Sequence, residues 1–324
     1  MLRDKVFQMF ILGSGNLDYA VTEGAGGVIF FSDDIKTEEQ FKNLIDTLKQ
    51  KAKTPLFFSI DQEGGRVERT INIRESRFLS PQFAFKNGAD YLSKQTVKIA
   101  EELNHLGLNT NFAPCLDVNS NPNNPIIGER AFSNNPEDVC KGYDITSNIY
   151  SSHNIIPVIK HFPGHGDTST DSHKELPIVN LTKEELENIH IQPFKYAISK
   201  GADAMMVAHI HCTYFDKDEI PTSLSKNCIS YIRNTLHFDG VLISDDMFMK
   251  GVEKYSQLEA CIKGIEAGLD MFIYRESSDK ILALIEEVIE IAERDSELSN
   301  NINNSYNRIQ KIDTKLAFST RKIC

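Results

Sequence analysis

A short apolar run that ends in two carboxylates lies at Gly240-Val241-Leu242-Ile243-Ser244-Asp245-Asp246-Met247. Its length and its branched aliphatic residues are typical of a strand that is buried on both faces of a parallel sheet. Comparable runs are spaced along the chain at residues 8–12, 27–31, 55–60, 109–113, 156–160, 204–208 and 270–274. Eight buried strands is the number that closes a (β/α)8 barrel.

Segments with helical periodicity separate these runs. One helix is predicted to begin at Thr37, another at Thr182, which forms a capping box with Glu185, and a third covers residues 282–292. Strands that alternate with helices imply parallel pairing through right-handed crossovers. An open doubly wound sheet is the alternative, but no G-x-G-x-x-G motif follows an early strand. We therefore predict an α/β fold with a single (β/α)8 TIM-type barrel.

The chain has 324 residues, of which 40% are hydrophobic and 25% are charged. This composition is that of a globular protein and excludes the disordered and collagen-like classes. The length predicts one barrel domain over residues 1–324, with a short helical tail after about residue 297. The polar residues 300–304 predict a turn before the last helix of that tail.

Charge and cysteine usage limit the partners of the protein. The formal net charge is −11 and there is no long basic run, which weighs against binding to nucleic acid. No apolar run approaches the roughly 18 residues of a membrane helix, so we expect no membrane insertion. The six cysteines show no zinc-type spacing and indicate a reducing compartment. We expect a cytoplasmic monomer that needs no cofactor.

Ionisable residues gather where the predicted strands end, which is where barrels of this kind carry their active sites. They are Asp61, Asp117, Lys160 with His161, His209 with His211, and Asp245 with Asp246. Because side chains alternate along a strand, only one of the last two carboxylates is expected to face the barrel mouth. We assign that place to Asp245 and expect Asp246 to cap a helix. A lone carboxylate there suits covalent attack on an anomeric carbon or stabilisation of an oxocarbenium ion.

The segment KHFPGHGDTSTDSH at residues 160–173 permits three interpretations. One is a metal site formed by its histidines together with His209 and His211, although no H-E-x-x-H motif supports it. Another is a dyad in which Asp171 orients His173 and raises its basicity, so that the imidazole can donate and accept a proton. In the third, the histidines only satisfy hydrogen bonds of the loop.

Further charged residues lie around the third predicted strand. Glu63 and Arg66 are candidates for an internal ion pair that holds the loop after this strand, and Arg130 is another cation of the same kind.

Several separated segments together resemble glycoside hydrolase family 3, in its bacterial β-N-acetylglucosaminidase branch of peptidoglycan recycling. They are IDQEGGRV at 60–67, NFAP with LDVN at 111–119, residues 121–130, KHFPGHGDT at 160–168, DSH at 171–173 and SDDM at 244–247. Matches at several separated sites in one order are more specific than any one motif.

The resemblance implies a barrel that removes terminal β-linked N-acetylglucosamine with retention, acting on an amino-sugar glycoside such as a muropeptide fragment. By the family's pattern Asp245 is the nucleophile, and His173 with Asp171 forms the acid/base dyad. The sugar pocket would be lined by Asp61, Arg69, Arg130, Lys160 and His161. The chain has no tryptophan, the strongest platform for stacking on a sugar, so hydrophobic contacts are expected from Phe162, Met247, Met249 or other side chains. The chain ends about 50 residues after the last predicted strand, so we expect the acid/base group to come from the barrel's own loops.

Two other functions remain open at this point. A β-N-acetylglucosaminide phosphorylase would use phosphate as the acceptor in place of water, since a neutral imidazole repels phosphate less than a carboxylate does. A metal-dependent amidohydrolase barrel would use the histidine cluster.

Overall fold

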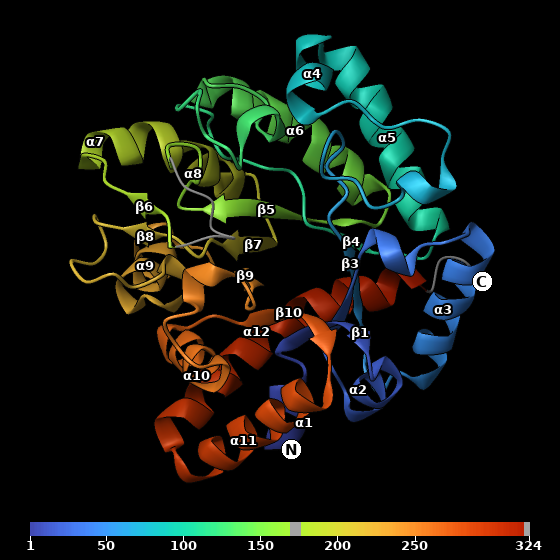
Figure 1. The fold of residues 1–324 in the computed structure, drawn as a ribbon, viewed down its shortest axis with the longest axis vertical. Helices are drawn as coiled ribbons and strands as arrows, with labels where there is room; N and C mark the ends of the chain where they lie inside the picture. Colours follow the sequence, from blue (N-terminus) through green and yellow to red (C-terminus); the bar gives the residue numbers. More distant parts are fainter. Residues whose placement is uncertain (169–175, 321–324) are drawn as a thin grey trace.

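Eight parallel strands close into a barrel in the computed structural model, which describes residues 1–168 and 176–320, with side chains up to residue 312. Around the barrel the strand order is β1-β10-β9-β7-β5-β4-β3-β2, and every neighbouring pair is parallel (Figure 1). The barrel strands are β1 (Phe10–Gly15), β2 (Gly27–Phe30), β3 (Phe57–Ile60), β4 (Thr110–Asn111), β5 (Ile156–Phe162), β7 (Ala204–Val207), β9 (Val241–Asp246) and β10 (Met271–Ser277). The predicted (β/α)8 barrel is confirmed.

Helices surround the barrel, and a small parallel sheet lies outside it. The small sheet pairs β6 (Ile178–Val179) with β8 (His211–Cys212). The helices are α1 (Leu2–Phe7), α2 (Leu17–Glu23), α3 (Glu38–Lys51), α4 (Pro81–Lys86), α5 (Ala89–His105), α6 (Pro136–Ser152), α7 (Lys183–Glu185), α8 (Gln192–Ser199), α9 (Lys226–Ser230), α10 (Gln257–Ala267), α11 (Asp279–Arg294) and α12 (Ser296–Thr320). Within the described chain, no helix combines the length and the apolar character that a membrane crossing requires.

The three predicted helices are confirmed. Thr37 caps α3 by accepting a hydrogen bond from the backbone N–H of Gln40 at 3.2 Å. Thr182 and Glu185 form the predicted capping box at the start of α7. A π-helical segment, Leu186–His190, then separates α7 from α8. The third apolar stripe forms the buried face of α11.

The first strand begins and ends later than predicted. It extends through Gly13, which lacks a side chain to signal a strand. A Cβ at this position would lie 2.0 Å from the carbonyl oxygen of Arg275 on β10. Glycine is therefore required for β1 and β10 to approach this closely, and the apolar pattern alone could not reveal that need.

The C-terminal helix α12 closes the amino-terminal end of the barrel (Figure 1). Its Ser305 and Arg308 bond to Leu269 and Asp270, just before β10. The turn predicted at residues 300–304 is wrong, because α12 continues through this polar stretch. The helix is kept regular by tertiary packing, since Ile302 is fully buried within its polar surroundings. With this end covered, the opposite end of the barrel is left for a site.

Asp270 should be a stability determinant of the barrel floor. Its buried carboxylate receives Arg308 Nε at 2.8 Å, Arg233 Nη2 at 2.6 Å and the backbone N–H of Leu242 at 2.8 Å. Because Asp270→Asn leaves two guanidinium groups without their charge partner, we expect it to lower the free energy of unfolding by about 3 kcal/mol. Urea denaturation measures this loss.

The matched control is Asp239→Asn. Asp239 also pairs with α12, through Lys311, but both side chains of this pair are exposed. An exposed pair contributes less than about 1 kcal/mol. Equal losses in the two variants would contradict the role given to Asp270.

Candidate functional site

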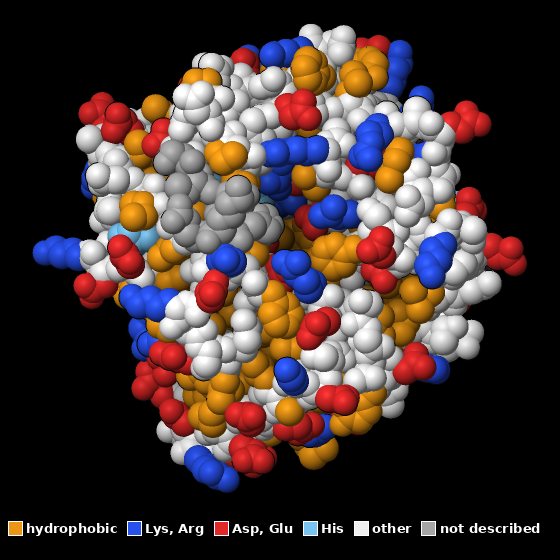
Figure 2. Space-filling view, in the orientation of Figure 1, with side chains coloured by type: hydrophobic (Ala, Val, Ile, Leu, Met, Phe, Trp, Pro, Cys, Tyr) orange, Lys and Arg blue, Asp and Glu red, His pale blue; other side chains and the backbone are white. Residues whose placement is uncertain are grey.

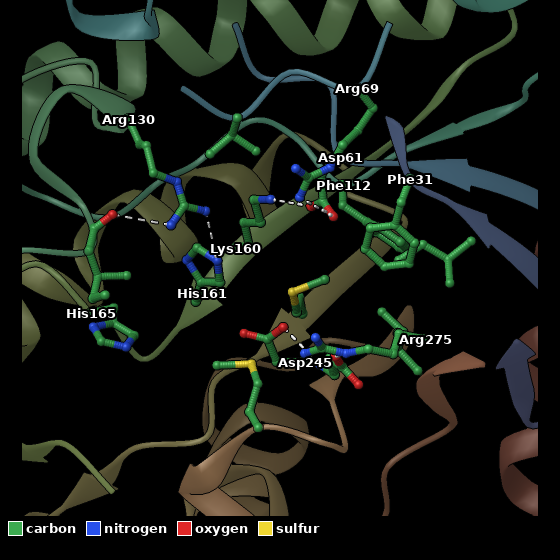
Figure 3. Close-up of a pocket in the computed structure, with 17 residues that line it drawn as sticks. Phe31, Asp61, Arg69, Phe112, Arg130, Lys160, His161, His165, Asp245 and Arg275 are labelled. Atoms are coloured by element: carbon green, nitrogen blue, oxygen red, sulfur yellow. Dashed lines mark hydrogen bonds and ion pairs between the residues drawn. The ribbon is translucent and has the colours of Figure 1, made fainter. Parts of the chain in front are cut away.

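A cavity of about 350 Å³ opens at the carboxyl ends of the barrel strands. Figure 2 shows it as a hollow near the centre of this face, with Lys and Arg side chains on its rim. Its ionisable lining residues come from the ends of β3, β5, β9 and β10 and from the loops beside them (Figure 3). They are Asp61, Arg69, Arg130, Lys160, His161, His165, Asp245, Asp246 and Arg275. The five residues predicted to bind substrate therefore share one pocket with Asp245.

Lys160 is the buried centre of the pocket wall. It lies near the carboxyl end of β5 with only 1% of its surface exposed, and its Nζ lies 2.8 Å from Asp61 Oδ1 and 2.6 Å from Glu63 Oε1. Burial would lower the pKa of Lys160, but the two carboxylates outweigh it and raise that pKa. Lys160 therefore stays charged and fixes Asp61 at the cavity surface.

Glu63 forms a two-bond ion pair with Arg130 behind this wall. Arg130 Nε lies 2.9 Å from Oε2, and Nη2 lies 2.8 Å from Oε1. Burial would raise the pKa of Glu63, but Arg130 and Lys160 hold it below its usual value. The predicted ion pair between Glu63 and Arg66 is wrong, since Arg66 instead donates to backbone carbonyls of residues 125–127. Two glycines with positive φ after Glu63 turn the chain so that Arg66 leaves the pocket.

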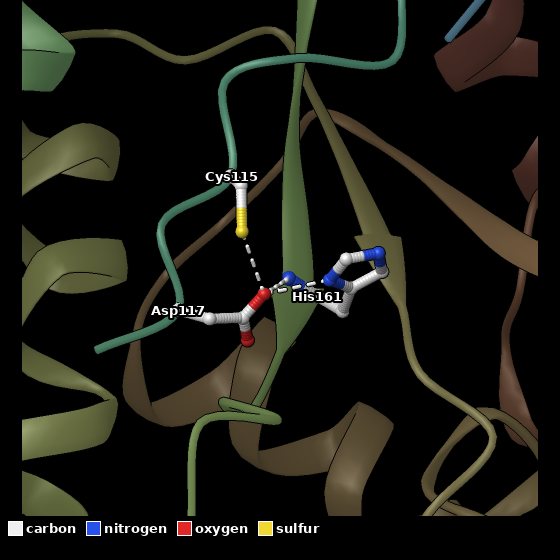
Figure 4. A group of neighbouring side chains, drawn as sticks. All are labelled: Cys115, Asp117 and His161. Atoms are coloured by element: carbon white, nitrogen blue, oxygen red, sulfur yellow. Dashed lines mark hydrogen bonds and ion pairs between the residues drawn. The ribbon is translucent and has the colours of Figure 1, made fainter. Parts of the chain in front are cut away.

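Asp117 organises the histidines beside this wall (Figure 4). Its Oδ2 lies 2.6 Å from His161 Nδ1 and accepts from Cys115 Sγ at 3.0 Å, and its Oδ1 accepts from the His165 backbone N–H at 2.5 Å. Arg130 Nη2 lies 3.3 Å from His161 Nε2. A guanidinium can only donate, so Nε2 accepts and Nδ1 carries the proton toward Asp117. Arg130 thereby selects one tautomer of His161.

The cluster of Cys115, Asp117 and His161 has ligand atoms within 4.8 Å of one another. Its donor set does not fit a metal ion. The three side chains already bond to each other, and the Arg130 guanidinium lies against the ring. Burial and the nearby Asp117 also raise the pKa of Cys115, which keeps its thiol protonated. The group is better explained as a hydrogen-bonded support for His161.

Asp245 and Asp246 both line the cavity, contrary to the prediction that only one faces the barrel mouth. Ile243 of β9 pairs with Met271 of β10, whereas Asp246 pairs with Ile273. One strand thus advances three residues where the other advances two. This β-bulge breaks the alternation and turns two consecutive side chains toward the mouth. The helix cap predicted at Asp246 is wrong, because its Oδ1 accepts from the Phe248 backbone N–H at 3.0 Å within a turn and no helix begins there.

The carboxylate of Asp245 is held in its charged form. Burial would raise its pKa, but His161, His209, Lys160 and the Asp246 backbone N–H together hold that pKa below the usual value. The N–H of Asp246 donates to Asp245 Oδ1 at 2.8 Å. A charged, oriented carboxylate at the centre of the pocket is what attack on an electrophilic carbon requires.

Arg69 joins the pocket from the loop after β3. Its guanidinium lies 5.6 Å from the ring centroid of Phe31, and its Nη2 lies 3.8 Å from Asp61 Oδ2. Gln62 shapes this loop, since its Oε1 accepts from the backbone N–H of Arg69 at 2.8 Å and from that of Thr70 at 3.3 Å. Arg69 is therefore placed by the loop and only loosely paired.

The predicted dyad, Asp171 and His173, lies outside the described residues. Among the histidines that the structure describes, His209 is committed to protein partners, with Nδ1 at 2.7 Å from Ser223 Oγ and Nε2 at 3.1 Å from the backbone oxygen of Asp245. With His161 also engaged at both nitrogens, the geometry speaks against the metal-dependent amidohydrolase.

Residues 1–312 match the family model described as "Glycosyl hydrolase family 3 N terminal domain". The chain belongs to this family. Beta-hexosaminidase A of Pseudoalteromonas piscicida is 32% identical in an alignment 330 positions long, which covers 92% of this chain and 54% of that protein. A beta-hexosaminidase of Actinobacillus pleuropneumoniae is 34% identical over 271 residues, covering 80% of this chain and 76% of its own length.

Solved structures of the family resemble this one closely. A glycoside hydrolase family 3 beta-N-acetylglucosaminidase from Paenibacillus matches with a TM-score of 0.91 and 31% identity over 98% of this chain and 63% of its own. The chain thus spans about half the length of the Pseudoalteromonas relative and under two thirds of the Paenibacillus protein.

Sequence reasoning missed one residue of this family 3 site and misplaced two of its expected apolar contacts. Arg275 follows the last predicted strand directly, so reading one residue further would have found it. Of the expected apolar contacts, Met249 lines the cavity, whereas Phe162 and Met247 are wrong because they are fully buried in the core. The apolar lining comes instead from other side chains, including Ile29, Phe31, Val67, Phe112, Ile126, Met206 and Ile273.

Glu63→Gln should reduce the pH dependence of stability. The folded-state pKa of Glu63 is depressed, so its ion pairs stabilise the fold fully above the unfolded pKa of about 4.3. That stabilisation is lost as the pH falls below about 5 toward the folded pKa. Wild type should therefore lose more free energy of unfolding between about pH 6 and about pH 3 than the variant, as urea denaturation at each pH measures.

At neutral pH the same variant should be less stable by about 3 kcal/mol, because two buried cations lose a partner. Glu293→Gln, which removes an exposed carboxylate of α11, serves as the control and should keep the wild-type pH dependence. Parallel curves for wild type and Glu63→Gln would refute the depressed pKa.

Proposed function

We propose that the chain is a retaining exo-β-N-acetylglucosaminidase that removes terminal β-linked N-acetylglucosamine from peptidoglycan fragments. The observation that carries this proposal is the place of the Asp245 carboxylate in the strand-end cavity, where the Asp246 backbone N–H orients it and Lys160, Arg130 and Arg275 line the same space. Membership of glycosyl hydrolase family 3 and the beta-N-acetylglucosaminidase named among its structural neighbours support the substrate class.

The pocket wall suits a sugar with several hydroxyl groups. Asp61 presents a carboxylate that can accept from two hydroxyls, and Lys160, Arg130 and His161 line the cavity beside it while they hold their protein partners. These groups are held by the protein before substrate arrives, so little of the binding free energy goes into ordering them. The substrate-binding roles of these residues and of Arg69 are part of the proposal.

The reaction would proceed in two steps with retention. Asp245 attacks the anomeric carbon to form a glycosyl ester, while the bond to the leaving oxygen breaks and that oxygen takes a proton from His173. His173 then accepts a proton from water as its oxygen attacks the same carbon and frees Asp245. We assign the orientation of His173 to Asp171, since a carboxylate raises the basicity of the imidazole it accepts from.

The proposal includes the setting in which the protein works. The five cysteines in the described residues are buried and form no disulfide, which fits a reducing, cytoplasmic compartment. We further propose that the protein acts as a monomer, needs no cofactor and binds no nucleic acid.

Asp245→Ala should abolish release of 4-nitrophenol from 4-nitrophenyl N-acetyl-β-glucosaminide, because the glycosyl ester cannot form. We expect a loss of kcat by about a thousandfold or more. Asp46→Ala removes an exposed carboxylate of α3 and should leave the rate unchanged. Activity retained by Asp245→Ala would place the nucleophile elsewhere.

The same assay separates hydrolysis from phosphorolysis. Hydrolysis should run at full rate in phosphate-free buffer and yield free N-acetylglucosamine. A requirement for phosphate, with the sugar 1-phosphate as product, would overturn the hydrolase proposal in favour of the phosphorylase.

His173→Ala should affect substrates according to their leaving group. A disaccharide has a poor leaving group and needs protonation, so kcat/KM should fall by about 10²-fold or more. Nitrophenolate leaves without a proton, and kcat/KM for the nitrophenyl glycoside should change by less than about tenfold. Equal losses of kcat/KM on the two substrates would exclude the acid role.

A further inference from the structure

We propose that Arg275 is the residue that selects N-acetylated sugars, by donating hydrogen bonds to the carbonyl oxygen of the 2-acetamido group. The inference rests on the proposed function and assigns one specific contact within it.

The backbone and Nε of Arg275 are held by the protein, whereas its two terminal nitrogens face the cavity. It lies near the carboxyl end of β10, and its backbone is pressed against Gly13 of β1. Its Nε forms an ion pair with Asp246 Oδ2. Within the described residues, no acceptor contacts its Nη1 or Nη2, and 49% of the side chain is exposed. Two donors of a planar fork are thus left for a ligand.

The other guanidinium groups of the pocket are placed differently. Arg130 is only 11% exposed, and its nitrogens bond to Glu63, Ile126 and His161. Arg69 lies beside Asp61, on the wall proposed to bind hydroxyls. Arg275 is anchored instead to the residue that follows the proposed nucleophile.

The position of Arg275 fits the substituent next to the reacting carbon. Figure 3 shows Asp245 with Arg130 and His161 toward one side and Arg275 toward the other. If C1 of the sugar lies at Asp245 and its outer hydroxyls meet the wall with Lys160, the group on a carbon adjacent to C1 faces Arg275. In N-acetylglucosamine, C2 is such a carbon and carries the acetamide.

Apolar residues on the same side suit the methyl of that acetamide. Ile273 lies two residues before Arg275, hence on the same face of β10, and lines the cavity. Ile29 and Phe31 line it from β2 and its end, and Figure 3 places Phe31 on the Arg275 side. A guanidinium beside an apolar surface matches a carbonyl beside a methyl better than it matches a lone hydroxyl.

The test compares two substrates with the same leaving group, 4-nitrophenyl N-acetyl-β-glucosaminide and 4-nitrophenyl β-glucoside. The measured quantity is the ratio of their kcat/KM values. Arg275→Gln should lower the preference for the acetamide by about tenfold, the lower range for a hydrogen bond from a charged donor, because the side chain is half-exposed. Arg275→Lys keeps the charge but loses the planar pair of donors, so its preference for the acetamide should lie between that of wild type and that of Arg275→Gln.

Controls separate selection from other effects. Arg294→Gln removes an exposed arginine of α11 and should leave the ratio unchanged. Thermal unfolding identifies any variant that fails to fold. An unchanged ratio would overturn the proposal. If both kcat/KM values then fell by the same factor, Arg275 would be a positioning residue for Asp246.

Two further measurements keep this inference distinct from its alternatives. A loss confined to glycosides with a carboxylated leaving group would assign Arg275 to an anionic aglycone instead and overturn the acetamide contact. Calorimetric titration with N-acetylglucosamine and with glucose tests recognition without turnover. If wild type hydrolyses neither glycoside but binds N-acetylglucosamine more tightly through Arg275, the proposed function fails while this inference stands. Equal affinities in wild type and Arg275→Gln would overturn it.

Discussion

The pocket depends on one buried arrangement of alternating charges, in which Lys160 lies between Asp61 and Glu63, and Glu63 is held in turn by Arg130. Removing charges from water is costly unless each has a close partner. Here every member except Asp61 is almost completely buried, so the four groups must stay together. The ends of β3 and β5 and the loop before α6 are therefore held in one geometry, and Asp61 is the charge that this arrangement presents to the cavity.

A second network supports the first from behind. The carboxylate of Asp117 accepts four hydrogen bonds, from Cys115, from the ring and backbone of His161 and from the backbone of His165. Such bonds to the charged form hold the pKa of Asp117 below its usual value in spite of burial. By contrast, burial lowers the pKa of His165 to about 4, so this ring is neutral at physiological pH. Arg130 links the two networks through His161, and the pocket wall is thereby ordered before any ligand binds.

The opposite side of the cavity depends on strand register rather than on buried ion pairs. There the β-bulge between β9 and β10 brings two carboxylates to the mouth, one oriented by a backbone N–H and the other paired with Arg275. Fewer of the donors on this side are used by the protein. The pocket thus combines a wall of completed ion pairs with a side that has hydrogen-bonding capacity to spare, which suits a substrate that has hydroxyls at one end and an amide near its reacting carbon.

The sequence alone determined the barrel, because eight short apolar runs separated by amphipathic helices have few other ways to bury their side chains. It also brought Asp61, Lys160, His161 and Asp245 to one end, since parallel strands share the direction of their carboxyl ends. Only the tertiary structure decided the partner of Glu63, the regular course of α12 through its polar residues and the joint exposure of Asp245 and Asp246 to the cavity. Those features arise from contacts between strands and loops far apart in the chain, and from a β-bulge in the pairing of two strands. The residue pattern along a single strand carries no information about either.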